Sequence, residues 1–292
     1  MNSEKERKRP NSRRNLDMAL QRLYGPGANL VQVRMAMANT IVGQMLPDVV
    51  IKGGTSLRLR YGRGNSRYTI DCDVARRKEL DTFIGELRSA LSTGWNGFAG
   101  DLISKAPAKP KGVPTEYVMQ PFEVKLSYLG RSWCTVLLEV GTNEVGLADE
   151  PEMRPVAPDI VELFTSLGFP APNPLPLMPL AFQVAQKLHG VSAAGSDRAR
   201  DLVDLQLIMA NDHVELAKVR DICERLFKYR KCQSWPPTIV KGDSWDSLYN
   251  AQKGALNVLP NCDEAVAWAN DLITSINKED GTSSLVQLAE RL

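Results

Sequence analysis

Histidine is scarce in this sequence of 292 residues, and its cysteines are scattered. There are two histidines and five cysteines, and no two cysteines have the C-x-x-C spacing. Zinc sites and disulfide frameworks need such ligands in recognisable groups along the chain. We therefore expect neither, but reduced structural thiols of the kind usual in cytosolic proteins.

Long apolar runs are also lacking. No run approaches the roughly 20 residues that cross a bilayer. The basic, polar stretch 1–15 has no hydrophobic segment behind it, so it does not predict a secretory signal. Apolar residues make up 43% and charged residues 24%, which excludes disorder throughout the chain. We expect a cytoplasmic protein without a membrane segment.

A strong excess of charge of either sign is missing too. The formal net charge is +2, so total charge does not indicate a nucleic-acid binder. The positive residues are clustered instead, first in the arm 1–15 and again between positions 58 and 78. A solvated surface is one explanation, and contact with RNA phosphates is the other. The candidate RNA-contacting residues are Arg58, Arg63, Arg67, Arg76, Arg77 and Lys78.

The order of the patterns predicts an α+β protein of two lobes. A basic flexible arm (1–15) precedes a core (16–150) in which apolar strands alternate with helices, which predicts a mixed β-sheet with flanking helices. Eight prolines between Pro151 and Pro179 predict an interdomain linker there. Helical periodicity then continues through an all-helical lobe (180–292).

Two acidic residues stand two positions apart in an expected strand, 68–74. Asp71 and Asp73 therefore point to the same face, about 6 to 7 Å apart. Two such carboxylates repel each other unless a hard cation such as Mg²⁺ bridges them, which makes a site for triphosphate chemistry. Glu139, on the expected strand 133–140, is a candidate third ligand; a solvent-facing glutamate is the alternative.

A glycine pair ends the apolar strand 48–52. Backbone N–H groups at such a strand-to-helix turn approach phosphate oxygens closely, and hydroxyls at the helix start add donors. Alone this pattern is also a common turn. Followed about fifteen residues later by D-x-D, it marks the DNA polymerase β-like nucleotidyltransferase superfamily. The candidate nucleotide-binding residues here are Gly53, Gly54, Thr55 and Ser56.

The helical lobe offers a lysine and two aspartates. Lys187 borders an apolar helical stripe, where a surface lysine with a buried stem is the ordinary alternative to a functional one. Asp201 and Asp204 are three residues apart and share a helix face. By themselves they would be explained as a cap and a solvated face.

Taken together, these segments resemble a known family. Lys-Gly-Gly-Thr-Ser, Asp-Cys-Asp, Gln-Lys-Leu-His and Arg-Asp-Leu-Val-Asp-Leu follow one another between Lys52 and Ile208 in the order and spacing of the AbiEii/MenT nucleotidyltransferase toxins. The chain resembles the mycobacterial-type MenT branch in particular, through Ser66-Arg67 before the D-x-D and Ala75-Arg76-Arg77 after it.

The resemblance implies a bilobed, Mg²⁺-dependent nucleotidyltransferase of a toxin–antitoxin system. Such enzymes transfer a nucleoside monophosphate, often a pyrimidine, from an NTP to the 3′ acceptor end of tRNA, which blocks aminoacylation; a cognate antitoxin restrains them. By resemblance, Asp71 and Asp73 hold the metal, Lys187 binds the nucleotide, and Asp204 is the final essential aspartate. The triphosphate is held by Gly53, Gly54 and Ser56.

One position departs from the wider family, in which an acidic residue often precedes the D-x-D. Here Thr69-Ile70 places a hydroxyl beside the acids. An antitoxin that phosphorylated Thr69 or Ser66 would set a dianion against Asp71 and Asp73. Two rival functions stay open: nucleotidylation of a protein or small molecule, and a catalytically inert binding module of the same fold.

Overall fold

The structure is a computed structural model that describes residues 8–107 and 118–278. The chain forms two compact units. Of the described residues, the first unit, called here the sheet unit, takes those up to Gly62, those from Tyr68 to Asn143, and Ala148–Leu177. The second, the helical unit, takes Arg63–Arg67, Glu144–Leu147 and the described residues from Met178 onward. Two short segments inside the N-terminal half thus cluster with the C-terminal helices.

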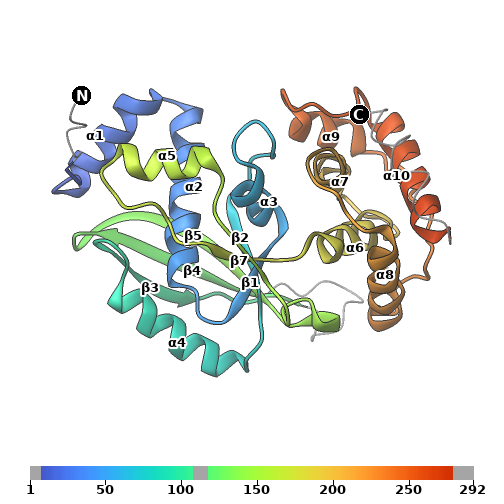
Figure 1. The fold of residues 1–292 in the computed structure, drawn as a ribbon, viewed down its shortest axis with the longest axis horizontal. Coiled ribbons are helices and arrows are strands. Elements are labelled where there is room, and N and C mark those ends of the chain that lie inside the picture. The colour runs from blue at the N-terminus through green and yellow to red at the C-terminus, as the bar shows by residue number, and fades with distance from the viewer. Residues whose placement is uncertain (1–7, 108–117, 279–292) are drawn as a thin grey trace. The chain divides into compact units, whose positions relative to one another are not determined.

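A seven-stranded mixed sheet forms the centre of the sheet unit (Figure 1). β1 pairs with β7, and β2 with β5, in parallel; the other neighbours are antiparallel. The α+β class expected from the sequence is confirmed. In spatial order the strands are β3 (Phe98–Ser104), β4 (Gln120–Tyr128), β5 (Arg131–Gly141), β2 (Asp71–Arg76), β1 (Val49–Lys52), β7 (Leu175–Leu177) and β6 (Glu152–Arg154).

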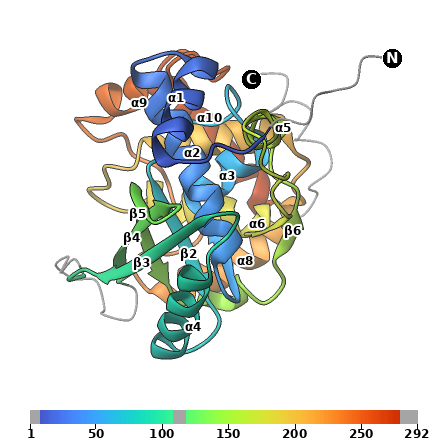
Figure 2. The same cartoon turned by 90° about the vertical axis from the view of Figure 1, so that its left-hand side faces the viewer.

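One face of this sheet is covered by helices that share a single core with it. Alternate residues of β4, from Phe122 to Tyr128, are buried in that core, while Glu123 and Lys125 point away from it. Figure 2 shows α4 running beside β3. The covering helices are α1 (Arg13–Tyr24), α2 (Ala28–Met45), α4 (Leu80–Thr93) and α5 (Pro158–Ser166). The acids of β2 and β5 are therefore left on the opposite face.

The proline-rich segment 151–179 forms ordered elements. It contains β6, α5 and β7, and it clusters with the sheet unit as far as Leu177. Its prolines fit this structure: Pro158 occupies the first turn of α5, where a missing N–H costs nothing. Strands of three residues are too short to show a period of two, which is why the prolines dominated the sequence pattern.

The arm at the N-terminus gives way to helix earlier than its charge suggested. α1 begins at Arg13, and the Ser12 hydroxyl caps it by accepting the N–H of Asn15 at 3.2 Å. Positions 1–7 of the expected arm lie outside the described residues.

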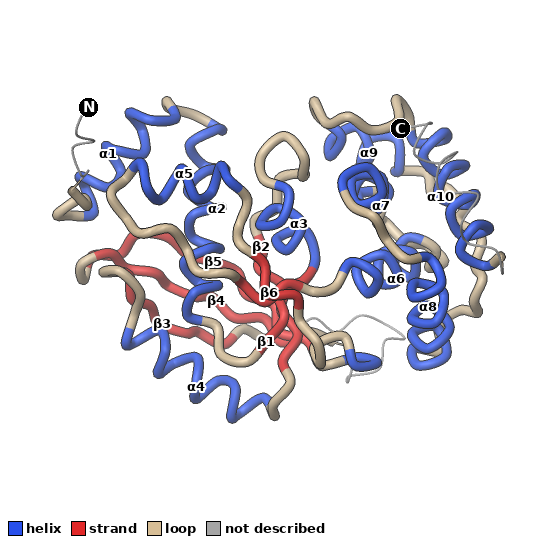
Figure 3. Tube along the Cα trace, in the orientation of Figure 1, coloured by secondary structure: helices blue, strands red, loops and turns tan. Residues whose placement is uncertain are grey.

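Five helices make up most of the described part of the helical unit, where Figure 3 colours them blue. None of the described helices is both long and apolar enough to cross a membrane. All five cysteines lie within the described residues and are free thiols. The helices are α6 (Leu180–Val191), α7 (Arg200–Asn211), α8 (Leu216–Arg230), α9 (Trp245–Lys253) and α10 (Cys262–Asn277).

Candidate active site

A glycine turn and an aspartate meet in the sheet unit. β1 runs antiparallel to β2 and leads directly into α3 (Gly53–Tyr61). Gly53 has φ +65°, a conformation that side chains disfavour. A β-carbon placed there would lie 2.3 Å from Oδ2 of Asp73. Glycine is therefore required at this position for two reasons, the positive φ and the lack of room for a β-carbon. The Asp73 carboxylate lies against the start of α3.

The two hydroxyls that follow the glycines differ in what they do. Thr55 Oγ1 donates to the backbone carbonyl of Asp71 at 2.5 Å and accepts from Asn39 Nδ2 at 3.3 Å. It fastens α3 to β2 and has little left for a phosphate. Ser56 Oγ is buried and has no hydrogen-bond partner among the described residues. Because an unmet buried hydroxyl is costly, Ser56 is the better candidate for a ligand contact.

The three expected acids share one face. Asp71 and Asp73 alternate along β2, and Asp73 is the direct neighbour of Glu139 in β5. Thr69 Oγ1 donates to Asp71 Oδ1 at 2.6 Å. Within the described ranges, no three histidine, cysteine, aspartate or glutamate side chains form a ready-made metal cluster.

Mg²⁺ does not require such a cluster from the protein. This ion usually keeps several waters and completes its shell with substrate phosphates instead of an all-protein cage. Two hard oxygen donors beside a turn with no β-carbon in the way fit such an ion with a bound triphosphate. The role of Glu139 as a third ligand stays a prediction.

Lys52 has no role of its own in the functional prediction from the sequence, but the structure places it beside the acids. It is buried and pairs with Asp73 across β1 and β2, so Lys52, Asp73 and Glu139 stand in one row on adjacent strands. Its Nζ lies 3.2 Å from the place where Gly141 would carry a β-carbon. A cation beside the acids offsets their repulsion. The available signal was a lysine at the end of an otherwise apolar strand.

The cysteine between the two acids takes no part in this chemistry. Cys72 points to the core side of β2 and is buried. Burial, with the nearby charges of Asp73 and Asp71, raises the pKa of the Cys72 thiol far above its usual range. The thiol therefore stays protonated and serves packing.

In the helical unit Lys187 is buried, not a surface residue. Its side chain is 5% exposed, and its Nζ lies 2.6 Å from Asp204 Oδ2 and 3.2 Å from Asp201 Oδ1. α6 supplies the lysine and α7 both aspartates. A buried ammonium needs such counter-charges. The alternative of a surface lysine is thus ruled out for this position.

Two arginines complete the cluster. Arg67 Nε lies 3.0 Å from each carboxylate oxygen of Asp204, and Arg198 Nε lies 2.6 Å from Asp201 Oδ2. Burial alone would raise the pKa of Asp201, but the Lys187 ammonium and the Arg198 guanidinium hold it well below its usual range. Three cations and two carboxylates leave one net positive charge, which favours an anionic ligand.

Two members of this cluster were not among the candidates from the sequence. The sequence pattern places Asp201 only on the same helix face as Asp204, and it gives Arg198 no role. Their signal was local: Arg198 and Asp201 stand three apart, which places them together at the start of a helix.

The candidate RNA-contacting residues have divergent surroundings. Arg58, mostly buried, pairs with Asp159 at 2.7 Å, and Arg67 is held by Asp204 as described. These two have structural roles, and contact with a phosphate would require their pairs to open. Of the other four, Arg63, Arg77 and Lys78 are exposed and Arg76 is half-buried. Arg76 donates to the Lys78 carbonyl, Arg77 pairs with Asp48, and Lys78 pairs with Glu86.

A carboxylate pair on one strand, set against a glycine turn that opens a helix, defines the class of protein as a nucleotidyltransferase. The chain belongs to the AbiEii family of nucleotidyl transferase toxins from type IV toxin–antitoxin systems, whose profile matches residues 41–270. The resemblance drawn from the sequence motifs is confirmed.

Several solved structures are similar to the chain over most of its length. MenT4, a nucleotidyltransferase toxin from Mycobacterium tuberculosis, has 17% sequence identity and a TM-score of 0.49, with 94% of this chain and 98% of that chain covered. JHP933 from Helicobacter pylori has 18% identity and a TM-score of 0.41, with 88% and 95% covered. A search among curated protein sequences gives no match.

Proposed function

We propose that this toxin transfers a nucleoside monophosphate, from CTP or UTP, to the 3′ acceptor end of a tRNA. The modified tRNA could then not be aminoacylated, and translation would stop until a cognate antitoxin restrained the enzyme. The observation that carries the transfer chemistry is the contact of the Asp73 carboxylate with Gly53. It sets the acid beside the backbone N–H groups at the start of α3, where a triphosphate binds well.

The candidate site residues of the sheet unit have different parts in this proposal. The N–H groups after Gly53 and Gly54 and the Ser56 hydroxyl bind the triphosphate. Asp71 and Asp73 would hold Mg²⁺, which would supply positive charge to offset that of the phosphates during in-line attack at the α-phosphorus. Thr69 fixes the orientation of Asp71 through its hydrogen bond. The attacking hydroxyl gains mainly from being positioned near 3 Å in line.

The lysine of the helical unit binds the phosphates of the nucleotide and stabilises the leaving pyrophosphate. One charge contact at about 4 Å is worth roughly 4 kcal/mol at an effective dielectric near 20. That is about three decades in rate. Both oxygens of Asp204 are engaged by Lys187 and Arg67. We therefore assign Asp204 to orienting Lys187, not to accepting the proton of the attacking hydroxyl.

The acceptor is proposed to be RNA because a tRNA end is single-stranded and anionic. Arg63, Arg77 and Lys78 are the exposed cations that would follow its phosphates, together with the half-buried Arg76. Exposed ion pairs such as that of Lys78 with Glu86 contribute little, so they exchange partners readily. The affinity for RNA should then fall steeply as salt rises.

One labelling experiment separates this function from its rivals. Purified protein is incubated with Mg²⁺ and each α-labelled NTP, once with total RNA and once with RNA-free lysate protein and small molecules. We expect label from CTP or UTP on tRNA-sized RNA, and none with Asp73→Asn. Label on protein or on small molecules would show that the acceptor is one of these and not tRNA. No label in any fraction would favour the inert binding module.

A further inference from the structure

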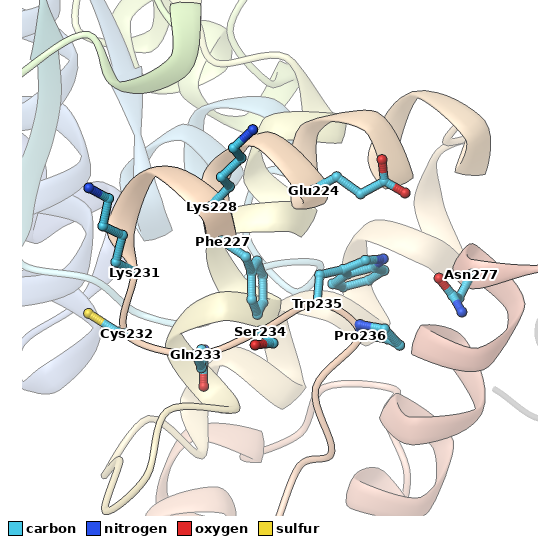
Figure 4. A pocket seen from close by; sticks show the side chains of 10 residues that line it. All are labelled: Glu224, Phe227, Lys228, Lys231, Cys232, Gln233, Ser234, Trp235, Pro236 and Asn277. Atoms are coloured by element: carbon cyan, nitrogen blue, oxygen red, sulfur yellow. The ribbon is translucent and has the colours of Figure 1, made fainter.

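A cavity in the helical unit has no part in the chemistry above. It lies where the C-terminal turn of α8, the segment 231–236 and the end of α10 meet, with a volume of about 720 Å³. That is within the usual range for small-ligand sites. Figure 4 shows Phe227 and Trp235 side by side in the middle of its lining, with Lys231 toward one end, Asn277 toward the other, and Lys228 above Phe227.

The aromatic wall of the cavity is held from behind by α6. The Phe227 ring packs edge-on against the rings of His189 and Trp235, with 4.7 Å and 5.4 Å between the ring centroids. Gln233 Nε2 donates to the His189 carbonyl at 2.7 Å and to Ser192 Oγ at 3.0 Å, which ties the segment 231–236 to the same helix. The Trp235 indole is thus presented on a fixed support.

His189, behind that wall, is a neutral ring. Burial, with the positive charges of Arg230 and Arg198, lowers the pKa of His189 to about 3. Arg230 approaches its Nδ1 at 3.3 Å and pairs with Glu144. The support therefore does not change its charge near neutral pH.

The arginines of α8 and the two lysines that line the cavity differ in whether they have ion-pair partners. Its arginines are paired: Arg220 with Glu224, Arg225 with Asp221, and Arg230 with Glu144. Lys228 and Lys231, on the rim of the cavity, make no ion pair or hydrogen bond through their ammonium groups with any described residue. Glu224, the one carboxylate of the lining, is already matched by Arg220. The rim therefore presents uncompensated positive charge next to an indole.

We propose that this cavity binds a nucleotide of a single-stranded RNA segment, with the base against Trp235 and the flanking phosphates on Lys228 and Lys231. Aromatic stacking combined with backbone cations is how proteins hold single strands without a duplex. Ser234 and Asn277 supply polar groups for the edge of the base. The inference rests on the proposed RNA acceptor and gives the enzyme a second contact with it.

The test measures RNA binding apart from catalysis. Equilibrium affinity for unmodified tRNA is measured without NTP for the full chain, for Lys228→Ala/Lys231→Ala, for Trp235→Leu and for the control Lys218→Ala. Lys218 is an exposed lysine of the same helix, about 15 Å from Lys228 along the axis. We expect at least about a fivefold loss in the double lysine variant and in Trp235→Leu, and none in the control.

Salt dependence gives a second readout. Two lost phosphate contacts should make the slope of log affinity against log salt shallower by about 1.4 in the double lysine variant. Unchanged affinity and slope in the variants, with tRNA binding intact in the natural chain, would overturn the cavity assignment alone. Equal competition by heparin and by single-stranded RNA would also overturn it, since it would reduce the site to a polyanion patch. A natural chain that bound no RNA would instead remove the proposed acceptor.

Discussion

Gly53 and Asp73 are in contact through the very space that a side chain at position 53 would fill. The ideal β-carbon position lies 2.3 Å from Asp73 Oδ2 and 3.2 Å from its Cγ. Gly53 and Asp73 are twenty residues apart in the chain, and their contact makes the glycine turn and the D-x-D motif parts of one structure. A side chain added at position 53 would therefore displace the Asp73 carboxylate.

Gly53→Ala should nearly abolish nucleotidyl transfer, because the new methyl group displaces the Asp73 carboxylate. The matched control is Gly130→Ala, which has a similar positive φ of +73° but nothing within 4 Å of its β-carbon. Both variants should lose about 1 kcal/mol or more of stability from backbone strain. Transfer rates and thermal unfolding check this, and equal activity in the two variants would contradict the steric link.

Asp73→Ala and Lys187→Ala should each reduce the transfer rate by about three decades while the protein stays folded. Folding is expected to survive the loss of Lys187 because Arg67 and Arg198 still pair with the aspartates that it leaves. Single-turnover rates and circular dichroism measure the two effects. Full activity in either variant would reject the assignment of that residue.

Asp201 should contribute to stability in a pH-dependent way. Its pKa in the folded chain is lower than the usual value of about 3.9, so its contribution is complete above that pH and is lost as the pH falls below it. Asp201→Asn should therefore lower the free energy of unfolding at pH 7. It should also make that free energy fall less steeply between about pH 4 and pH 2. Denaturant unfolding across this range is the measurement. Asp221→Asn, which removes an exposed pair on α8, should leave the limb unchanged.

Glu139→Gln should raise the Mg²⁺ concentration that gives half-maximal activity, if the glutamate contributes to the metal site beside Asp73. A neutral amide is a weaker ligand for a hard cation. Glu123→Gln is the control, since Glu123 lies in β4 and pairs with Lys125 and Lys105. An identical Mg²⁺ dependence in both variants would leave Glu139 without a metal role.

Thr69 is the proposed phosphate acceptor for an antitoxin, and its surroundings set a condition on that reaction. The residue is 7% exposed and its hydroxyl donates to Asp71, so the segment before β2 must open before a kinase reaches it. Coexpression with the antitoxin should add one phosphate to the intact mass of the natural chain and none to Thr69→Val. An unmodified natural chain would count against the hypothesis, and modification of Thr69→Val would point to Ser66.

Local patterns in the sequence determined the elements and the faces of the side chains. Alternation in 68–74 placed Asp71 and Asp73 together, and helical periodicity predicted the all-helical stretch in which α6 to α10 lie. Such features depend on contacts within a few positions, which a period of 2 or 3.6 encodes directly. The family motifs added their order and spacing.

Only the tertiary structure decided which side chains meet. Arg67 reaches Asp204 across 137 positions, and that contact turns a candidate RNA ligand into part of a buried charge cluster. Lys187 is buried because α7 supplies two carboxylates to it. The three-residue strands β6 and β7 form because pairing with each other, and of β7 with β1, supplies hydrogen bonds to their backbone groups. Partners so distant in the chain leave no periodic trace in sequence, since packing alone brings them together.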